Sequence, residues 1–287
     1  MSSSKAQRPG KVQQITAVSN PRIKSIRSLA MKKNRDETGT FFVEGMKLVR
    51  DAFENGWVIR TLVYASSFVG KNNDLEDFAA RARATGSDIL EVNEKVLNAI
   101  TKKDNPQMIV GVMEQNWHQP TNIGALTDPK TVWLALDRIR DPGNLGTIIR
   151  TADCAGVNGI ILIGDTTDPF SVEATRATMG SIFNVPLIRM TEDTFIKWRK
   201  SWPGLVAGTH LAGATDYRSI DFKSRPVLLL MGNEQQGLTD ALASACDELV
   251  LIPMAGSADS LNLAIATGVM LFHMEKHMPD LVTRPVQ

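Results

Sequence analysis

The chain has 287 residues, of which 43% are hydrophobic and 22% are charged. That balance is typical of a folded globular protein and excludes an intrinsically disordered chain. The length suits one large domain or two ordinary ones. No apolar run approaches the roughly 18 residues of a membrane-spanning helix, and the N-terminus lacks the apolar segment of a signal peptide. We therefore expect a cytoplasmic protein.

The cysteines and histidines give no sign of a metal site. Cys154 and Cys246 each lie in a predicted helix without CxxC spacing, so we expect two buried thiols rather than a disulfide or a zinc ligand set. Among the four histidines, only His273 and His277 are spaced for one helix face, and they lack the HExxH pattern of a zinc helix. We expect no bound metal.

The charge is unevenly placed, although the net charge is only +1. Residues 1–35 contain no acid, and the rest of the chain, with 23 basic and 31 acidic residues, has a net charge of −8. The cations of this basic N-terminal arm are Lys5, Arg8, Lys11, Arg22, Lys24, Arg27, Lys32, Lys33 and Arg35. Such an arm is either a phosphate-binding segment or a solubilising tail, and its composition fits both.

Short strand and helix patterns alternate after the arm. The hydrophobic spacing predicts strands at 41–45, 57–65, 88–92 and 108–114, and helices at 46–56, 75–86 and 94–101. We interpret residues 36–115 as a compact α/β domain. Residues 116–130 have little periodicity and contain two prolines and a glycine, which makes them the best linker candidate.

The remaining part, 131–287, has a regular βα rhythm. Near-continuous apolar runs predict strands at 131–137, 159–164, 185–190, 205–210, 226–232 and 248–254. Helical patterns follow at 144–157, 171–183, 191–202, 238–247 and 261–277. Such runs are typical of strands buried on both faces of a parallel sheet. We predict an α/β domain with a mostly parallel sheet flanked by helices, with its ligand outside the carboxyl ends of the strands.

The loop after the first of these strands leads into a helix. In DPGNLGTIIR, Asn144 falls at the start of that helix, where Asn is a good N-cap. Arg150 lies in an apolar helical stretch and so needs an anionic partner. That partner is either a ligand or Asp153, three residues further along the same helix.

The loop after residues 226–232 is rich in glycine. A buried strand leads directly to Gly232, Glu234 and Gly237. Glycines permit close approach of a ligand to the backbone, and Glu234 can accept hydrogen bonds at the strand end. Ordinary turn chemistry explains this pattern about as well.

The loop after residues 248–254 is built of small residues. In IPMAGSADSLNLAIATG, Ser260 falls at an N-cap position and Asn262 in the first helical turn. A cleft of Gly, Ala and Ser backbone suits a flat adenine-type ligand. The alternative is an ordinary loop that joins a strand to a helix and binds no ligand. The GxGxxG and GxxxxGK[ST] patterns are missing, which argues against a dinucleotide-binding Rossmann domain and a P-loop nucleotidase.

Together the segments NLGTIIRTAD, MGNEQQGL and IPMAGSADSLNLAIATG resemble, in order and spacing, the three motifs of the SpoU/TrmH family of SPOUT RNA methyltransferases. The stretches ITAVSNPRIKSIRSL and FFVEGMKLVRDA are similar to the N-terminal substrate-binding domain of many members, which has a ribosomal-protein-like RNA-binding fold. The resemblance covers most of the chain.

The resemblance implies a trefoil-knotted C-terminal domain, S-adenosylmethionine as the cofactor, a homodimer, and methyl transfer to a ribose 2′-hydroxyl of structured RNA. Ribosomal RNA is the expected substrate, with transfer RNA as the alternative. A catalytically silent RNA-binding or ribosome-assembly factor that keeps the fold is the competing hypothesis.

The resemblance also implies roles for particular residues. Cofactor contacts fall on Thr209, Gly232, Ile252, Met254 and Leu261, and catalytic roles on Arg150, Asn144, Glu234, Ser260 and Asn262. Because arginine keeps its proton at any ordinary pH, Arg150 is better suited to bind RNA phosphate and stabilise a developing alkoxide than to act as a free base. Many members carry Ser where this chain has Ala264.

Overall fold

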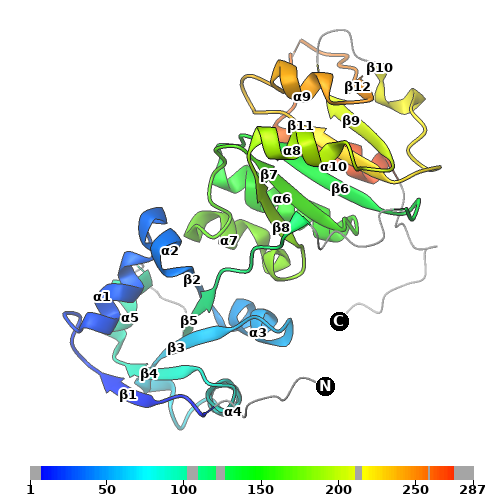
Figure 1. Ribbon diagram of the computed structural model, residues 1–287. Helices are drawn as coiled ribbons and strands as arrows, with labels where there is room; N and C mark the ends of the chain where they lie inside the picture. Colours follow the sequence, from blue (N-terminus) through cyan, green and yellow to red (C-terminus); the bar gives the residue numbers. More distant parts are fainter. Residues whose placement is uncertain (1–7, 102–108, 121–126, 211–214, 258, 275–287) are drawn as a thin grey trace. The chain divides into compact units, whose positions relative to one another are not determined.

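A computed structural model of the chain describes residues 8–101, 109–120, 127–210, 215–257 and 259–274. The chain forms two compact units (Figure 1). One contains Met1–Asn116 and Phe170–Phe183, and the other contains Trp117–Pro169 and Asn184–Gln287. No helix in the described ranges has the length and apolar character needed to span a bilayer.

The first unit is built on a five-stranded sheet with the order β1-β4-β3-β5-β2. Its strands are β1 (Val12–Ile15), β2 (Thr40–Glu44), β3 (Ile59–Ala65), β4 (Asp88–Val92) and β5 (Ile109–Glu114). β1, β4 and β3 run parallel, whereas β5 is antiparallel to both β3 and β2. β1 was not predicted, because its four residues are too few to show a period.

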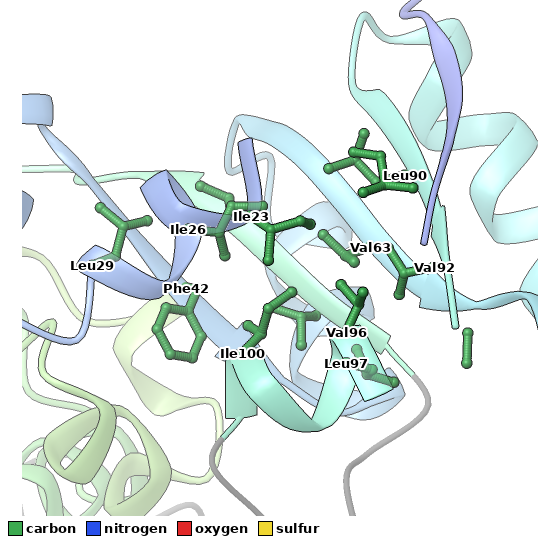
Figure 2. Packing of buried hydrophobic residues seen from close by; sticks show 14 residues of the cluster. Ile23, Ile26, Leu29, Phe42, Val63, Leu90, Val92, Val96, Leu97 and Ile100 are labelled. Atoms are coloured by element: carbon green, nitrogen blue, oxygen red, sulfur yellow. The ribbon is translucent and has the colours of Figure 1, made fainter. Parts of the chain in front are cut away.

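Helices cover this sheet. They are α1 (Pro21–Ser28), α2 (Lys32–Thr38), α3 (Met46–Glu54), α4 (Asn73–Ala84), α5 (Glu94–Thr101) and α7 (Val172–Thr178), with 3-10 turns at Ser66–Phe68 and Ser181–Phe183. α1 begins where the Asn20 side chain accepts from the Arg22 amide and Pro21 sets the first helical φ. Its buried face, Ile23 and Ile26, packs into the cluster that also holds Phe42 and Ile100 (Figure 2). The cationic segment from residue 12 to residue 38 is therefore folded as β1, α1 and α2.

The segment Phe170–Phe183 packs within the first unit although it follows β7 in the sequence. The Arg176 guanidinium donates to both carboxylate oxygens of the buried Glu44, each at 2.9 Å. The Trp57 indole N–H donates to the Phe183 carbonyl at 3.1 Å. An ion pair at a largely buried carboxylate and a ring of aromatic contacts thus hold the segment in place.

The second unit contains a seven-stranded sheet with the order β10-β12-β9-β11-β6-β7-β8 (Figure 1). Its strands are β6 (Val132–Asp137), β7 (Gly159–Ile163), β8 (Leu187–Met190), β9 (Leu205–Thr209), β10 (Thr215–Asp216), β11 (Val227–Met231) and β12 (Glu248–Leu251). Every strand pair described in this sheet is parallel. The predicted parallel α/β sheet is confirmed. This strand order does not test the trefoil knot, which stays a prediction.

Among its described residues, the second unit also has four α-helices. They are α6 (Pro142–Cys154), α8 (Glu192–Arg199), α9 (Asp240–Ser244) and α10 (Leu263–His273), with a 3-10 turn at Tyr217–Ser219. α6 packs against α10. The predicted helices are confirmed as far as they are described, and the end of the one predicted at 261–277, including His277, lies outside the described residues.

The expectation of two buried thiols was wrong for one of them. Cys154 is exposed, because it is the last residue of α6 and the turn that follows leaves it uncovered. The Cys246 thiol donates to the Leu242 carbonyl, and burial raises its pKa to about 12. This second thiol fits the expectation of an inert, largely buried group.

Candidate active site

The site lies at the carboxyl ends of four neighbouring strands. β12, β9, β11 and β6 are adjacent in the sheet and parallel, so the loops that follow them meet at one edge. The strand order also reverses here, since β6 leads to β7 on one side and the later strand β11 lies on the other. A cavity of about 400 Å³ opens among these loops. It is lined by Thr209, His210, Met231, Gly232, Asn233, Glu234, Gln235, Gln236, Gly237, Val250, Leu251, Ile252, Met254, Asp259, Ser260, Leu261, Leu263 and Ala266.

All five residues predicted to contact a cofactor line this single cavity: Thr209, Gly232, Ile252, Met254 and Leu261. They come from the end of β9 and from the loops after β11 and β12, three segments that are well separated in the sequence. The lining combines backbone and apolar side chains with a few polar groups, which is typical of sites for small organic ligands.

Gly232 lines the cavity at a point where the backbone leaves no room for a side chain. A Cβ at this position would lie 2.5 Å from the backbone nitrogen of Leu238, with Gly237 closer still. Gly237 itself has φ +67°, a conformation that favours glycine. Both glycines singled out in the sequence are therefore required by the tight turn after β11, which brings the backbone to the cavity.

Three of the predicted catalytic side chains form a chain of hydrogen bonds. The Asn144 amide nitrogen faces Glu234 Oε1 at 3.5 Å, and Asn144 Oδ1 accepts from the Asn262 amide at 3.0 Å. A carboxylate only accepts, so Glu234 fixes the orientation of the Asn144 amide, which in turn fixes that of Asn262. The three motif loops are thus joined by a chain of hydrogen bonds in which each donor and each acceptor is fixed.

The N-caps differ from the prediction. Asp141, not Asn144, caps α6, since its side chain accepts from the Asn144 backbone amide at 2.6 Å and Pro142 occupies the first helical position. Asn262, not Ser260, caps α10, because its Oδ1 accepts from the Ala264 and Ile265 amides.

These cap assignments change what the side chains do. The true caps lie three residues before Asn144 and two residues after Ser260. Asn144 is consequently free to extend its amide across to the other loops. Ser260 is an exposed loop residue that lines the cavity.

Glu234 also holds the start of the first motif. Its carboxylate accepts from the backbone amides of Arg140 and Asp141 at 3.3–3.4 Å. Hydrogen bonds from backbone amides to a charged carboxylate are strong, so they hold the Glu234 side chain in place. The loop after β11 thereby fixes the position of the two residues that precede α6.

Arg150 is exposed on α6 and does not line the cavity. Within the described part of the chain it makes no hydrogen bond or ion pair. The alternative pairing with Asp153 is not formed, since the Asp153 carboxylate accepts from Asn184 instead. The structure therefore brings together four of the five predicted catalytic residues and leaves the Arg150 guanidinium available for another partner.

Sequence reasoning missed two residues that shape the site. Asn233 bonds across its own loop to Gly237, and Arg138 reaches that loop from the end of β6. A signal was present for Asn233, because Asn side chains in turns bond to the backbone two residues further along, as this one does to Gln235. Nothing in the sequence near Arg138 indicated its contacts.

Comparison with known proteins places the chain in a family. The sequence profile of the SpoU rRNA Methylase family matches residues 131–272, and that of the MRM3-like substrate binding domain matches residues 20–111. The chain belongs to the SpoU rRNA methylase family.

Relatives agree along nearly the whole length. The 23S rRNA (guanosine(2553)-2′-O)-methyltransferase RlmP of Bacillus subtilis is 32% identical, over 92% of this chain and 99% of its own. The crystal structure of an AdoMet-bound rRNA methyltransferase from Sinorhizobium meliloti is 53% identical with a TM-score of 0.88, covering 94% of this chain and all of that one. The SpoU methyltransferase AviRb of Streptomyces viridochromogenes, solved with AdoMet, is 31% identical with a TM-score of 0.77, covering 89% and 97%.

Proposed function

We propose that this chain transfers a methyl group from S-adenosylmethionine to a ribose 2′-hydroxyl of ribosomal RNA. The observation that carries the proposal is the single cavity, lined by all five residues predicted for the cofactor and bordered by the chain Glu234–Asn144–Asn262. The 2′-O-methyltransferases among the relatives support both the reaction and ribosomal over transfer RNA.

The cavity fits such a cofactor. Its volume of about 400 Å³ falls within the roughly 300–1,000 Å³ of small-molecule sites. Backbone at Gly232, Ile252 and Leu261 would hold the polar edges of the ligand, and Met254 and Thr209 would complete the walls. When bound, S-adenosylmethionine supplies an electrophilic methyl group on its sulfonium.

The protein must then align and activate the hydroxyl. Asn144, Glu234, Ser260 and Asn262 form the polar border at which a ribose would be positioned. The exposed Arg150 would bind RNA phosphate and stabilise the alkoxide that develops as the 2′-hydroxyl loses its proton. A guanidinium stays protonated, so the proton itself passes to another acceptor, directly or by way of a phosphate oxygen.

RNA binding falls to the N-terminal part, residues 1–35 with the domain 36–115. Lys24 and Arg27 on α1 are exposed, as is Lys32 at the start of α2. These three cations form no ion pair with any described residue. Exposed, unpaired cations over a folded helix favour phosphate contact over a merely solubilising role.

We also propose a homodimer, with α10 at its interface. Ile265 and Phe272, seven residues apart and therefore on one face of the helix, are 56% and 42% exposed. A large apolar pair on a helix that already packs against α6 suits a second copy of the chain. Because its substrate is ribosomal RNA, we propose that the protein acts in the cytoplasm.

The test is Arg150→Ala, with Arg150→Lys as the charge-preserving control. Loss of a group that stabilises transition-state charge costs about 10²–10³-fold in rate. We expect methyl transfer to fall by that factor, whereas calorimetry shows unchanged affinity for S-adenosylhomocysteine. Wild-type methylation by the Ala variant would refute the role of Arg150, and no cofactor binding by the wild-type chain would favour a silent RNA-binding factor.

A further inference from the structure

An ion pair between a buried carboxylate, Asp137, and a partly exposed arginine, Arg138, lies at the end of β6. The Asp137 side chain is 1% exposed, and its two oxygens accept from Arg138 Nε and Nη2, each at 2.9 Å. Neighbouring residues of an extended strand point to opposite faces, so this bidentate contact requires a bend. Arg138 supplies the bend with φ +47°, a conformation that costs free energy for any residue with a Cβ. The Asp137 hydrogen bond raises the Arg138 pKa above its ordinary value.

Arg138 uses this conformation to reach the loop after β11. Its Nη1 donates to Gln236 Oε1 at 2.9 Å, and its Nη2 donates to the Gly237 carbonyl at 3.2 Å. Its own carbonyl accepts from the Asn233 amide group at 2.8 Å, and its backbone N–H donates to the Ile163 carbonyl at 3.0 Å. One residue therefore ties the loop to two strands of the sheet.

The loop it holds is a closed turn. Asn233 and Gly237 exchange two backbone hydrogen bonds of 3.0–3.1 Å, and Asn233 Oδ1 accepts from the amides of Gln235 and Gln236. Every residue of this turn lines the cavity, and Glu234 lies within it. A shift of the turn would move the cavity wall and the carboxylate that orients Asn144 together.

We propose that Arg138, held by Asp137, is the positioning residue that fixes the turn Asn233–Gly237 as a wall of the cofactor cavity. Arg138 does not line the cavity, so it acts through the turn. The bidentate fork matters, because a single ammonium group cannot bond Asp137, Gln236 and the Gly237 carbonyl in one geometry. The identity of the ligand rests on the proposed function, whereas the contacts by which Arg138 holds the turn do not depend on it.

The test removes both charges, because Arg138→Met alone would leave Asp137 buried without this partner. In the full-length chain carrying D137N and R138M, we expect the Kd for S-adenosylhomocysteine to rise about tenfold, with the KM for RNA unchanged within twofold. Amide hydrogen exchange at Asn233 and Gly237 should quicken about tenfold. Arg138→Lys should restore part of the affinity.

A second Arg–Asp pair in the same unit, Arg199 with Asp247, provides the matched control, since neither residue lines the cavity. The variant with R199M and D247N should bind S-adenosylhomocysteine as the wild type does. Unchanged affinity and unchanged exchange in a folded D137N and R138M variant would overturn the proposal. Wild-type protein that fails to bind S-adenosylhomocysteine would count against the proposed function instead, and exchange at the turn would still decide the role of Arg138.

Discussion

Replacing Asn262 with Asp separates the two roles of this side chain. Asn262 Oδ1 caps α10 through the Ala264 and Ile265 amides at 2.9 and 3.3 Å, while its amide nitrogen donates to Asn144 at 3.0 Å. Asp is as good an N-cap as Asn, and its charge is favourable near a helix N-terminus by about 0.3–1 kcal/mol. It cannot donate, so the bond to Asn144, about 1 kcal/mol, is lost.

The free energy of unfolding should therefore change by less than about 1 kcal/mol in the Asp variant. Asn262→Ala loses the cap as well and should be less stable than the Asp variant by about 1 kcal/mol. Methyl transfer should fall about tenfold in both, the equivalent of about 1.4 kcal/mol, because Asn144 loses its anchor. Chemical denaturation measures the first quantity, and transfer of labelled methyl to RNA at saturating cofactor measures the second.

Thr191→Asp is the control, since Thr191 caps α8 by its side chain and does not line the cavity. This variant should keep full activity. An Asn262→Asp variant with wild-type methyl transfer would refute the claim that the chain of amides positions Asn144. An inactive Thr191→Asp variant would show that a cap exchange anywhere in the unit disturbs the site.

Arg176→Ala should destabilise the first unit by about 1–3 kcal/mol in denaturant titrations, because the buried Glu44 loses a charged donor that both of its oxygens share; Glu44→Gln should recover part of the loss. Asp88 is partly buried, yet hydrogen bonds from a backbone amide and an α1 arginine hold its carboxyl pKa below the ordinary value. Its contribution is thus present at neutral pH and lost as pH falls, so the stability cost of Asp88→Asn should vanish in acid. A thiol reagent at pH 8 should modify the exposed Cys154 rapidly and Cys246, with its pKa of about 12, only after denaturation.

The parallel sheet of the second unit could be predicted because its strands are uninterrupted apolar runs. Leu228, Leu229 and Leu230 are all fully buried, as expected for a strand covered on both faces. β1 could not be predicted in this way, since only Ile15 of its four residues is buried. Edge strands are fixed by their partners, here the parallel register with β4, and a partner some 77 residues away leaves no local pattern.

The residues of the site could be predicted from the sequence, but the hydrogen bonds between them could not. The glycines after β11 and the caps of α6 and α10 belong to local chemistry, although each cap was misplaced by two or three residues. An N-cap is decided by which side chain reaches the free amides, and Asp141 competes with Asn144 for that position. The bend at Arg138 depends on a buried carboxylate and on a loop almost a hundred residues later, so only the folded chain specifies it.

The polar chain through Asn144 explains why the three motifs act as one site. A carboxylate at one end can only accept, and the free amides of α10 at the other end can only donate, so both amide side chains between them have one orientation each. The residues joined in this way lie 90 and 118 positions apart in the sequence. Removing Glu234 leaves the Asn144 amide nitrogen without this acceptor, so only the bond from Asn262 still orients Asn144. A substitution in the loop after β11 should therefore loosen a side chain on α6, because the two are joined by a hydrogen bond.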